Sequence, residues 1–181
     1  MDTQKWPFTW QELEGERVRL RRHTLGDVED MVLAGSDADT QRFTTVPSPY
    51  QRHHAESFVG RTPQDNAGLY WVVTDAADPT GRYMGQIDLR TKLDGVYLDF
   101  GYLAAPWARG RGLMTDAVVV IARFAFGLGA QRLEIRARAD NAASRRVAEK
   151  AGFTFEGILR HALMERGQLE DCAVYSKLPT D

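Results

Sequence analysis

The chain has 181 residues, of which 43% are hydrophobic and 27% charged, the balance of an ordinary soluble protein. Its 23 Lys and Arg against 25 Asp and Glu give a net charge of -2, so the composition offers no electrostatic reason to expect a nucleic-acid partner. Cys172 is the only cysteine, which excludes an internal disulfide and a cysteine-based zinc site. Charges and Pro7 interrupt the first twenty residues, so no signal peptide or membrane span is expected. A single cytoplasmic domain over residues 1–181 is the resulting expectation.

The first third of the chain predicts one strand and two helices. Apolar residues at 18 and 20 alternate with arginines, the period of a half-buried strand. Thr24 then caps a predicted helix that ends near Gly35, with an aspartate three residues after the cap. Residues 36–50 are polar and carry two prolines, which predicts a loop, and a short helix is expected from Gln51 to about Arg61.

The remaining two thirds predict strands around two further helices. Aromatic and branched residues separated by DPTG and LDG turns indicate three antiparallel strands, and three- and four-residue apolar spacing indicates a long helix. The expected strands are 69–74, 83–91, 96–103, 133–137, 153–159 and 169–178, and the expected helices are 113–128 and 141–152. The fold class is α/β (α+β), with a mixed, mostly antiparallel sheet of about seven strands and helices on both faces.

A glycine-rich segment leads into the long helix. The run AAPWARGRGLMT places Gly110 and Gly112 where that helix begins. Unpaired N–H groups at a helix amino terminus suit a pyrophosphate, and Arg109 and Arg111 would add positive charge. The alternative is a plain loop with two solvated arginines. The segment matches neither G-x-x-x-x-G-K-[ST] nor a G-x-G-x-x-G after a first strand, which disfavours nucleotide hydrolysis and dinucleotide redox chemistry.

Two runs carry a resemblance to a known family. GYLAAPWARGRGLMTDAV followed by ADNAASRRVAEKAGFTFEGILR resembles the GNAT superfamily of N-acyltransferases, and the RimJ/RimL-like branch in particular. ERVRLRRHTLGDVEDM and GQLEDCAVYSKL extend this resemblance over nearly the whole chain. The resemblance implies an N-acyltransferase that uses acetyl-CoA or another acyl-CoA and no metal. It also implies direct attack by a primary amine in a ternary complex.

The same resemblance implies where the coenzyme binds. The loop 109–115 would hold the coenzyme A pyrophosphate through main-chain amides. The preceding strand would splay from its neighbour to admit the pantetheine arm, with the backbone around 102–104 polarising the thioester carbonyl. Trp107 occupies the first position of the motif, as is common in this branch. The implied coenzyme-binding residues are Tyr102, Leu103, Ala104, Trp107, Arg109, Gly110, Arg111, Gly112, Leu113, Met114, Thr115, Asn141 and Ser144.

Two residues are predicted to be catalytic. Asn141 and Ser144 form N-x-x-S at a helix start, a spacing that capping alone would explain. The resemblance places the serine near the coenzyme sulfur, so Ser144 is a hypothetical general acid. Asp99 lies in LDFGY where related sequences often have E-x-G-Y, and it is the candidate base, acting directly or through water. The alternative is an exposed strand carboxylate.

The acceptor is predicted on acid–base grounds. The reference pKa of an α-amine is about 7.7–8.0 and that of lysine about 10.4, so a weak carboxylate base suits a peptide or protein amino terminus better. A small-molecule amine acetyltransferase and a non-catalytic acyl-CoA-binding module remain alternatives. A dicarboxylic acyl group and a homodimer are also left open. Residues 36–61 and 160–170 are expected to be variable segments that shape acceptor choice, because loops carry specificity while the scaffold holds the donor.

Other side chains are expected to be structural. Cys172 is interpreted as a small buried hydrophobe. Arg136, Arg138, Arg145 and Arg146 are expected to be solvated. Four aromatic residues could line the acceptor cleft or belong to the core: Phe43, Tyr50, Trp71 and Tyr83.

Overall fold

The computed structural model describes residues 9–60, 68–92 and 97–181. Its centre is an eight-stranded sheet in the order β1-β2-β3-β4-β5-β6-β8-β7. Neighbouring strands run antiparallel except β5 and β6, which are parallel. The strands are β1 (Leu13–Glu14), β2 (Val18–Arg21), β3 (Gly68–Asp75), β4 (Gly85–Lys92), β5 (Tyr97–Ala104), β6 (Leu133–Arg138), β7 (Thr154–Glu165) and β8 (Gln168–Lys177).

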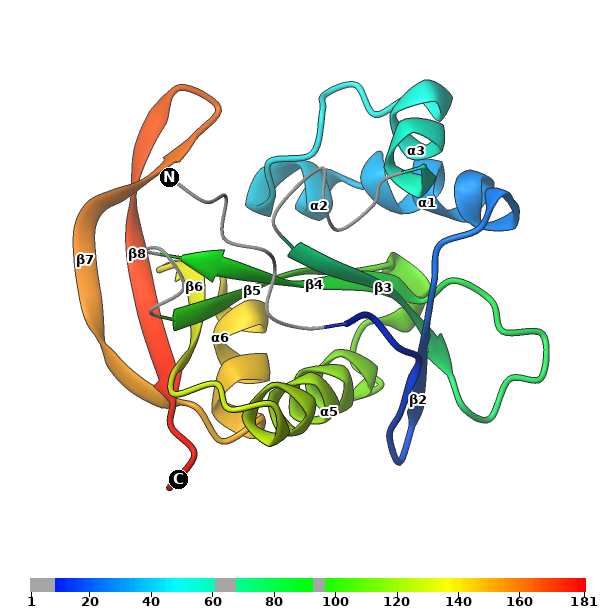
Figure 1. The fold of residues 1–181 in the computed structure, drawn as a ribbon. Helices are drawn as coiled ribbons and strands as arrows, with labels where there is room; N and C mark the ends of the chain where they lie inside the picture. The colour runs from blue at the N-terminus through cyan, green and yellow to red at the C-terminus, as the bar shows by residue number, and fades with distance from the viewer. Residues whose placement is uncertain (1–8, 61–67, 93–96) are drawn as a thin grey trace, which may run out of the picture.

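Helices cover both faces of the sheet (Figure 1). One face carries α1 (Val28–Gly35), α2 (Ala38–Phe43) and α3 (Arg52–Val59), and the other carries α5 (Leu113–Gly127) and α6 (Ala142–Lys150). Two short 3-10 helices, η1 (Leu25–Asp27) and η3 (Pro106–Ala108), precede α1 and α5. Among the described helices, none is long and apolar enough to cross a membrane.

Consecutive residues of β3 show how the two layers are held. Tyr70 points to the α1–α3 face, where its ring meets Phe58 of α3 edge-on at 5.4 Å. Trp71 points to the opposite face, where its ring meets Phe124 of α5 at 6.1 Å. The α5 stripe of Ala117, Val118, Ile121 and Ala125 is fully buried against that face. Burying a side chain the size of isoleucine contributes roughly 1.5–3 kcal/mol, so α5 is a principal source of stability.

The expected fold class is confirmed, and most predicted elements are present. Thr24 begins η1 as expected, with its backbone N–H donating to Asp27 Oδ2 at 2.8 Å, and α1 ends at Gly35. The strand at 18–20, the three antiparallel strands and both long helices are also found. Parts of two predictions, the LDG turn and the residues around position 61, lie outside the described residues.

Three predictions about elements need correction. The two-residue β1 was not expected, because a strand this short has no readable alternation. The predicted loop 36–50 contains α2, whose first turn is capped by Asp37 accepting from Thr40 N at 3.0 Å. The connection left between the predicted strands, residues 160–168, belongs almost entirely to a β7–β8 hairpin. Register shifts within β7 interrupt its alternation, and this hid the strand from sequence reasoning.

Candidate active site

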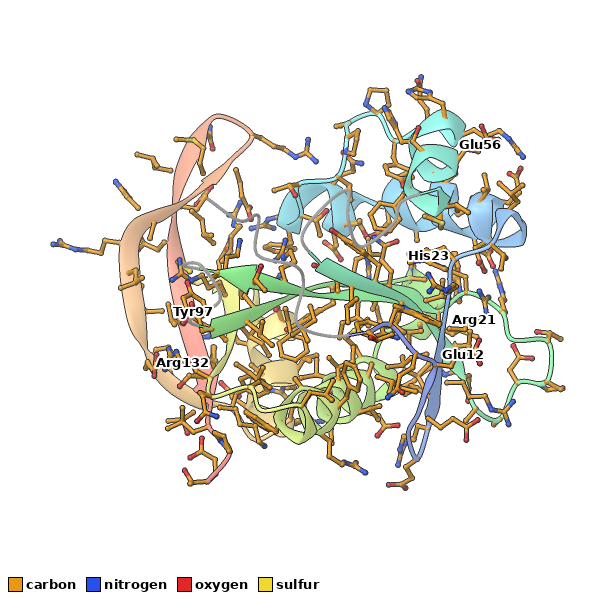
Figure 2. All side chains as sticks on the ribbon, viewed as in Figure 1. Glu12, Arg21, His23, Glu56, Tyr97 and Arg132 are labelled. Carbon is orange, nitrogen blue, oxygen red and sulfur yellow. The ribbon has the colours of Figure 1, made fainter. Side chains whose placement is uncertain are left out.

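A seam opens in the sheet between the two parallel strands. The β5–β6 ladder pairs Leu98 with Leu133, Asp99 with Glu134 and Phe100 with Ile135, yet β5 continues to Ala104 and β6 to Arg138. On its other side β5 stays paired with β4 as far as Ala104. The predicted splay is therefore confirmed, and it begins at Gly101. Figure 2 shows Tyr97 and Arg132 at the opposite, paired end of these strands.

The glycine loop lies at the start of α5. Gly110 and Gly112 have φ of 74° and 77°, a left-handed conformation that disfavours residues with a Cβ. Gly112 is the N-cap of α5 and supplies no side-chain hydrogen bond to the first turn. The backbone N–H groups of Leu113, Met114 and Thr115 occupy that first turn, where helix geometry provides no intrahelical partner. The loop thus has the form of an anion site made of backbone amides.

The arginines of this loop differ from expectation. Arg109 forms ion pairs with Asp37 and Asp39 at α2, and Arg111 forms one with Asp75 at the end of β3. Their charges are offset by carboxylates, so the loop's local positive charge is smaller than the sequence suggested. Arg17 approaches instead: its Nη1 lies 3.9 Å from where a Cβ on Gly112 would stand. This residue was missed because it is 95 positions away in the sequence.

Trp107 anchors the segment before the loop. Its indole N–H donates to the carbonyl of Tyr83 at 3.0 Å, and the guanidinium of Arg82 lies 4.6 Å from its ring centroid. These contacts fix η3 to the turn before β4. A role for Trp107 in coenzyme binding stays a prediction.

A pair of hydroxyl groups lies beside the seam. Tyr102 on β5 and Ser144 on α6 bring their side-chain oxygens to 2.8 Å. Asn141 caps α6 by accepting from Ser144 N at 3.1 Å, so the structural interpretation of the N-x-x-S spacing is correct whatever else these residues do. Burial raises the pKa of Tyr102 to about 12, against the opposing effect of the Ser144 hydrogen bond, so the phenol stays protonated at neutral pH. The Tyr102 side chain was not recognised from sequence, where only its backbone was considered.

Two carboxylates lie on the α1–α3 face of β4 and β5. Asp99 is 6% exposed, with Arg90 Nε 3.0 Å from its Oδ1 and Lys92 Nζ 3.6 Å from its Oδ2. Asp88 on β4 is paired with Gly101 on β5. Its Oδ2 lies 3.0 Å from Arg90 Nε, but the angles do not allow a hydrogen bond. Asp99 as base therefore stays a prediction. Asp88 is a second candidate that sequence reasoning missed, although its alternation with Ile87 and Leu89 placed it on a polar face.

The hairpin of β7 and β8 reaches across to α2. At its turn, Arg166 donates to the carbonyls of Gln41 at 2.8 Å and Val46 at 2.9 Å. On the same hairpin, a few residues from its turn, a surface hollow of about 370 Å³ is lined by Ala139, Asp140, His161, Leu169, Glu170 and Asp171. The two segments expected to shape acceptor choice therefore touch each other through Arg166.

The remaining predictions concern side chains around the site. Cys172 is fully buried, as expected, and burial raises the pKa of its thiol. Arg138 is not a solvated residue: its side chain is 15% exposed and lies within 4 Å of three carboxylates, those of Asp140, Glu165 and Glu170. Trp71 and Tyr83 belong to the core. Across residues 9–60, 68–92 and 97–181, no cluster of three or more His, Cys, Asp or Glu side chains could hold a metal ion.

Comparison with known proteins identifies the family. A family model described as an acetyltransferase (GNAT) domain matches residues 17–154. The chain is 31% identical to "Probable N-acetyltransferase YjcK" of Bacillus subtilis over 134 residues, 72% of each protein. It is 33% identical to "Putative ribosomal N-acetyltransferase YdaF" of the same organism over 146 residues, 79% of this chain and 72% of that protein. RimL, a ribosomal-protein alpha-N-acetyltransferase solved with coenzyme A, shares the fold with a TM-score of 0.78, at 18% identity over 93% of this chain and 98% of RimL.

The chain belongs to the GNAT acetyltransferase family, as its sequence resemblance implied. It is an acyl-CoA-dependent acetyltransferase with acetyl-CoA as the donor and an amine as the acceptor. The splayed seam and the glycine loop are the parts of the fold that suit this donor.

Proposed function

We propose that the protein transfers the acetyl group of acetyl-CoA to the α-amine at the amino terminus of a peptide or protein. The observation that carries this proposal is the seam that opens at Gly101, with a hydroxyl pair on one face of the sheet and carboxylates on the other. A carboxylate is a weaker base than an amine even when burial raises its pKa, and an α-amine is the biological primary amine that such a base deprotonates most readily near pH 7. The curated relative named as a ribosomal N-acetyltransferase supports the same acceptor class.

The donor is proposed to lie along α5 and β5. The N–H groups of residues 110–115 hold the pyrophosphate, and the pantetheine arm enters the seam beside β5. The unpaired edge at 101–104 offers backbone groups to the pantetheine and to the thioester carbonyl oxygen. Asn141 and Ser144 approach from α6 on the other side of this arm.

Ser144 is proposed to act on the leaving group. As the amine nitrogen forms its bond to the carbonyl carbon, the carbon–sulfur bond breaks and the sulfur gains negative charge. The Ser144 hydroxyl donates a hydrogen bond to that sulfur, while Tyr102 holds the serine at 2.8 Å. Tyr102 is thus a positioning residue. Its raised pKa keeps its proton available to Ser144 throughout the working range of pH.

The test is release of coenzyme A thiol from acetyl-CoA with matched acceptors. The first peptide has a free α-amine and no lysine. The second has a blocked amino terminus and one residue of the same sequence replaced by lysine. Polyamines and aminoglycosides complete the set. The proposal expects rapid release with the first peptide. Preference for a polyamine or aminoglycoside would assign a small-molecule acceptor, and acetyl-CoA binding without release in any arm would indicate a non-catalytic module.

A further inference from the structure

Asp88 and Asp99 lie on the same face of the sheet but at different distances from the open part of the seam. Asp99 is paired across β5–β6 with Glu134, in the closed part of the ladder. Asp88 is paired across β4–β5 with Gly101, the first residue of the splayed part. Asp99 precedes Gly101 by two residues on β5. Because a strand advances about 3.3 Å per residue, Asp99 lies roughly 7 Å from Gly101, on the side away from the splayed part. Of the two carboxylates, Asp88 is therefore nearer the backbone that meets the thioester.

The Asp88 carboxylate lies directly over the backbone of Gly101. A Cβ built on Gly101 would stand 2.8 Å from Asp88 Oδ1 and 2.9 Å from Oδ2, so only glycine leaves room for both oxygens. The Asp88 side chain retains 15% exposure, against 9% for Asp99. Asp88 Oδ2 is a buried acceptor atom without a hydrogen-bond donor in good geometry. An incoming ammonium group would supply such a donor.

The two carboxylates also differ in how fully they are neutralised. Asp99 receives hydrogen bonds from Arg90 through Nε at 3.0 Å and Nη2 at 3.5 Å, and it lies 3.6 Å from the Lys92 ammonium. Within the described parts of the chain, Asp88 Oδ2 lies 3.0 Å from the Nε of the same arginine but forms no hydrogen bond with it. A carboxylate held by two cations is a poorer proton acceptor than one with a free lone pair.

We propose that Asp88, and not Asp99, is the general base that takes the proton from the acceptor ammonium. This inference rests on the proposed function, since it names the base of the same site. Asp99 and Arg90 position the Asp88 carboxylate over Gly101. Asp88 would touch the substrate nitrogen, which makes it the catalytic residue of this group.

The electrostatic surroundings fit this role. Burial raises the pKa of Asp88 to about 7, with Asp99 adding to the increase and Arg90 and Lys92 opposing it. Tyr70, opposite Asp88 on β3, is the titratable side chain facing it from that strand, and α3 contributes the uncharged ring of Phe58 above Tyr70. A base whose pKa lies near the working pH is the most effective kind.

The protons balance in the following way. The ammonium loses its first proton to the Asp88 carboxylate, which becomes a carboxylic acid. The neutral nitrogen attacks the thioester carbon, and the adduct's remaining surplus proton ends on sulfur, by way of the Ser144 hydroxyl, as the carbon–sulfur bond breaks. Asp88 later returns its proton to water. The products are the amide, coenzyme A thiol and one released proton.

The experiment compares Asp88→Asn with Asp99→Asn, using the full chain and the best peptide acceptor. At pH 7 we expect Asp88→Asn to lower kcat/KM by about 100-fold, within the usual range for loss of a general base. Its acetyl-CoA Kd should stay within about twofold of wild type. In wild type, kcat/KM should fall at low pH as the base becomes protonated. Asp99→Asn should keep this acidic limb of the pH profile and should lose less kcat/KM than Asp88→Asn, through displacement of Arg90.

An acceptor that is already neutral needs no base. Its acetylation by Asp88→Asn therefore separates loss of a base from structural damage at the site. The same peptide ending in an alkoxyamine, which is neutral at pH 7, should restore Asp88→Asn to within about tenfold of wild type. An unchanged pH profile in Asp88→Asn, or loss of the acidic limb only in Asp99→Asn, would overturn the assignment. A wild-type protein that releases no thiol with any amine would overturn the proposed function, whereas an active wild type with a fully active Asp88→Asn overturns the base alone.

Discussion

At the scale of single residues, the proposed chemistry depends on side chains that are distant in sequence. Ser144 could be proposed from the sequence because the family resemblance places it near the coenzyme sulfur, whereas the N-x-x-S spacing alone indicates only a helix cap. Tyr102 and Asp88 could not, because their roles arise from contacts made across 42 residues in one case and across neighbouring strands in the other. Strand alternation alone indicates which face a residue occupies, but not what it meets there.

The hydroxyl pair leads to a prediction about the leaving group. Ser144→Ala should lower kcat by about 10- to 100-fold, because the departing sulfur loses its hydrogen-bond donor. Tyr102→Phe removes only the partner of the serine and should cost less, and neither change should shift the acetyl-CoA Kd by more than about twofold. Steady-state kinetics with equilibrium binding of acetyl-CoA measures both effects. A Ser144→Ala enzyme with unchanged turnover would contradict the assignment.

The raised pKa of Asp88 predicts a pH-dependent change in stability. Below the unfolded pKa, near 4, the carboxyl is protonated in both states and contributes no difference. As pH rises towards about 7, the unfolded chain loses this proton first, so wild-type stability falls and then levels off. Asp88→Asn removes this loss, and its Tm should exceed that of wild type by several degrees more at pH 8 than at pH 4.

Glu156 provides the control of opposite sign. Hydrogen bonds from Arg132 and Ser176 lower the pKa of Glu156 to about 2, so its contribution is present above about pH 4.5 and is lost as the pH falls towards 2. Glu156→Gln should therefore lower Tm slightly at pH 8, since the group is partly exposed. Thermal unfolding of both variants and wild type from pH 2 to 8 measures both effects, and parallel curves for Asp88→Asn and wild type between pH 4 and 8 would rule out a raised Asp88 pKa.

At the scale of elements, the proposed donor site consists of the α5 entry and the splayed strands. The helix, its glycine entry and the strand before it could be predicted from periodicity and motif. The ion pairs of Arg109 and Arg111 could not, since their partners lie on α2 and β3. The α2 helix was not predicted because its six residues carry too little periodic signal and two prolines follow it closely.

The conformation of Gly112 predicts a selective loss of donor binding. Alanine at φ of 77° is strained by roughly 1–2 kcal/mol, and its Cβ would project beside the first-turn amides. Gly112→Ala should raise the acetyl-CoA Kd by about tenfold. Gly129→Ala is the matched control, because its φ of 94° brings similar strain at the far end of α5. Equal Kd values for the two variants, measured by calorimetry, would show that backbone amides at Gly112 do not bind the donor.

At the scale of the whole molecule, the β7–β8 hairpin closes against α2. The sequence pattern predicted the mixed sheet with helices on both faces. It did not predict the ordered segments that meet here, α2 and the turn end of the hairpin. Their contact depends on Arg166, which donates to carbonyls about 120 residues away in the sequence. No local pattern carries that information.

This contact predicts a separation of acceptor and donor effects. Arg166→Ala should raise the acceptor KM several-fold, leave the acetyl-CoA Kd unchanged, and speed hydrogen exchange in residues 38–46. Arg160→Ala, an exposed arginine on the same hairpin, is the control and should change neither. Equal exchange rates in wild type and Arg166→Ala would show that the hairpin does not hold α2.

The central claim is acetyl transfer to an α-amine, and locating the acetyl group tests it most directly. The measurement uses one peptide with both a free amino terminus and an internal lysine, incubated with the protein and acetyl-CoA at pH 7, and maps the product by fragmentation mass spectrometry. The account predicts a single acetyl group on the α-nitrogen, formed faster than without enzyme. Acetylation of the lysine alone, or no acetylation above the uncatalysed rate, would contradict it.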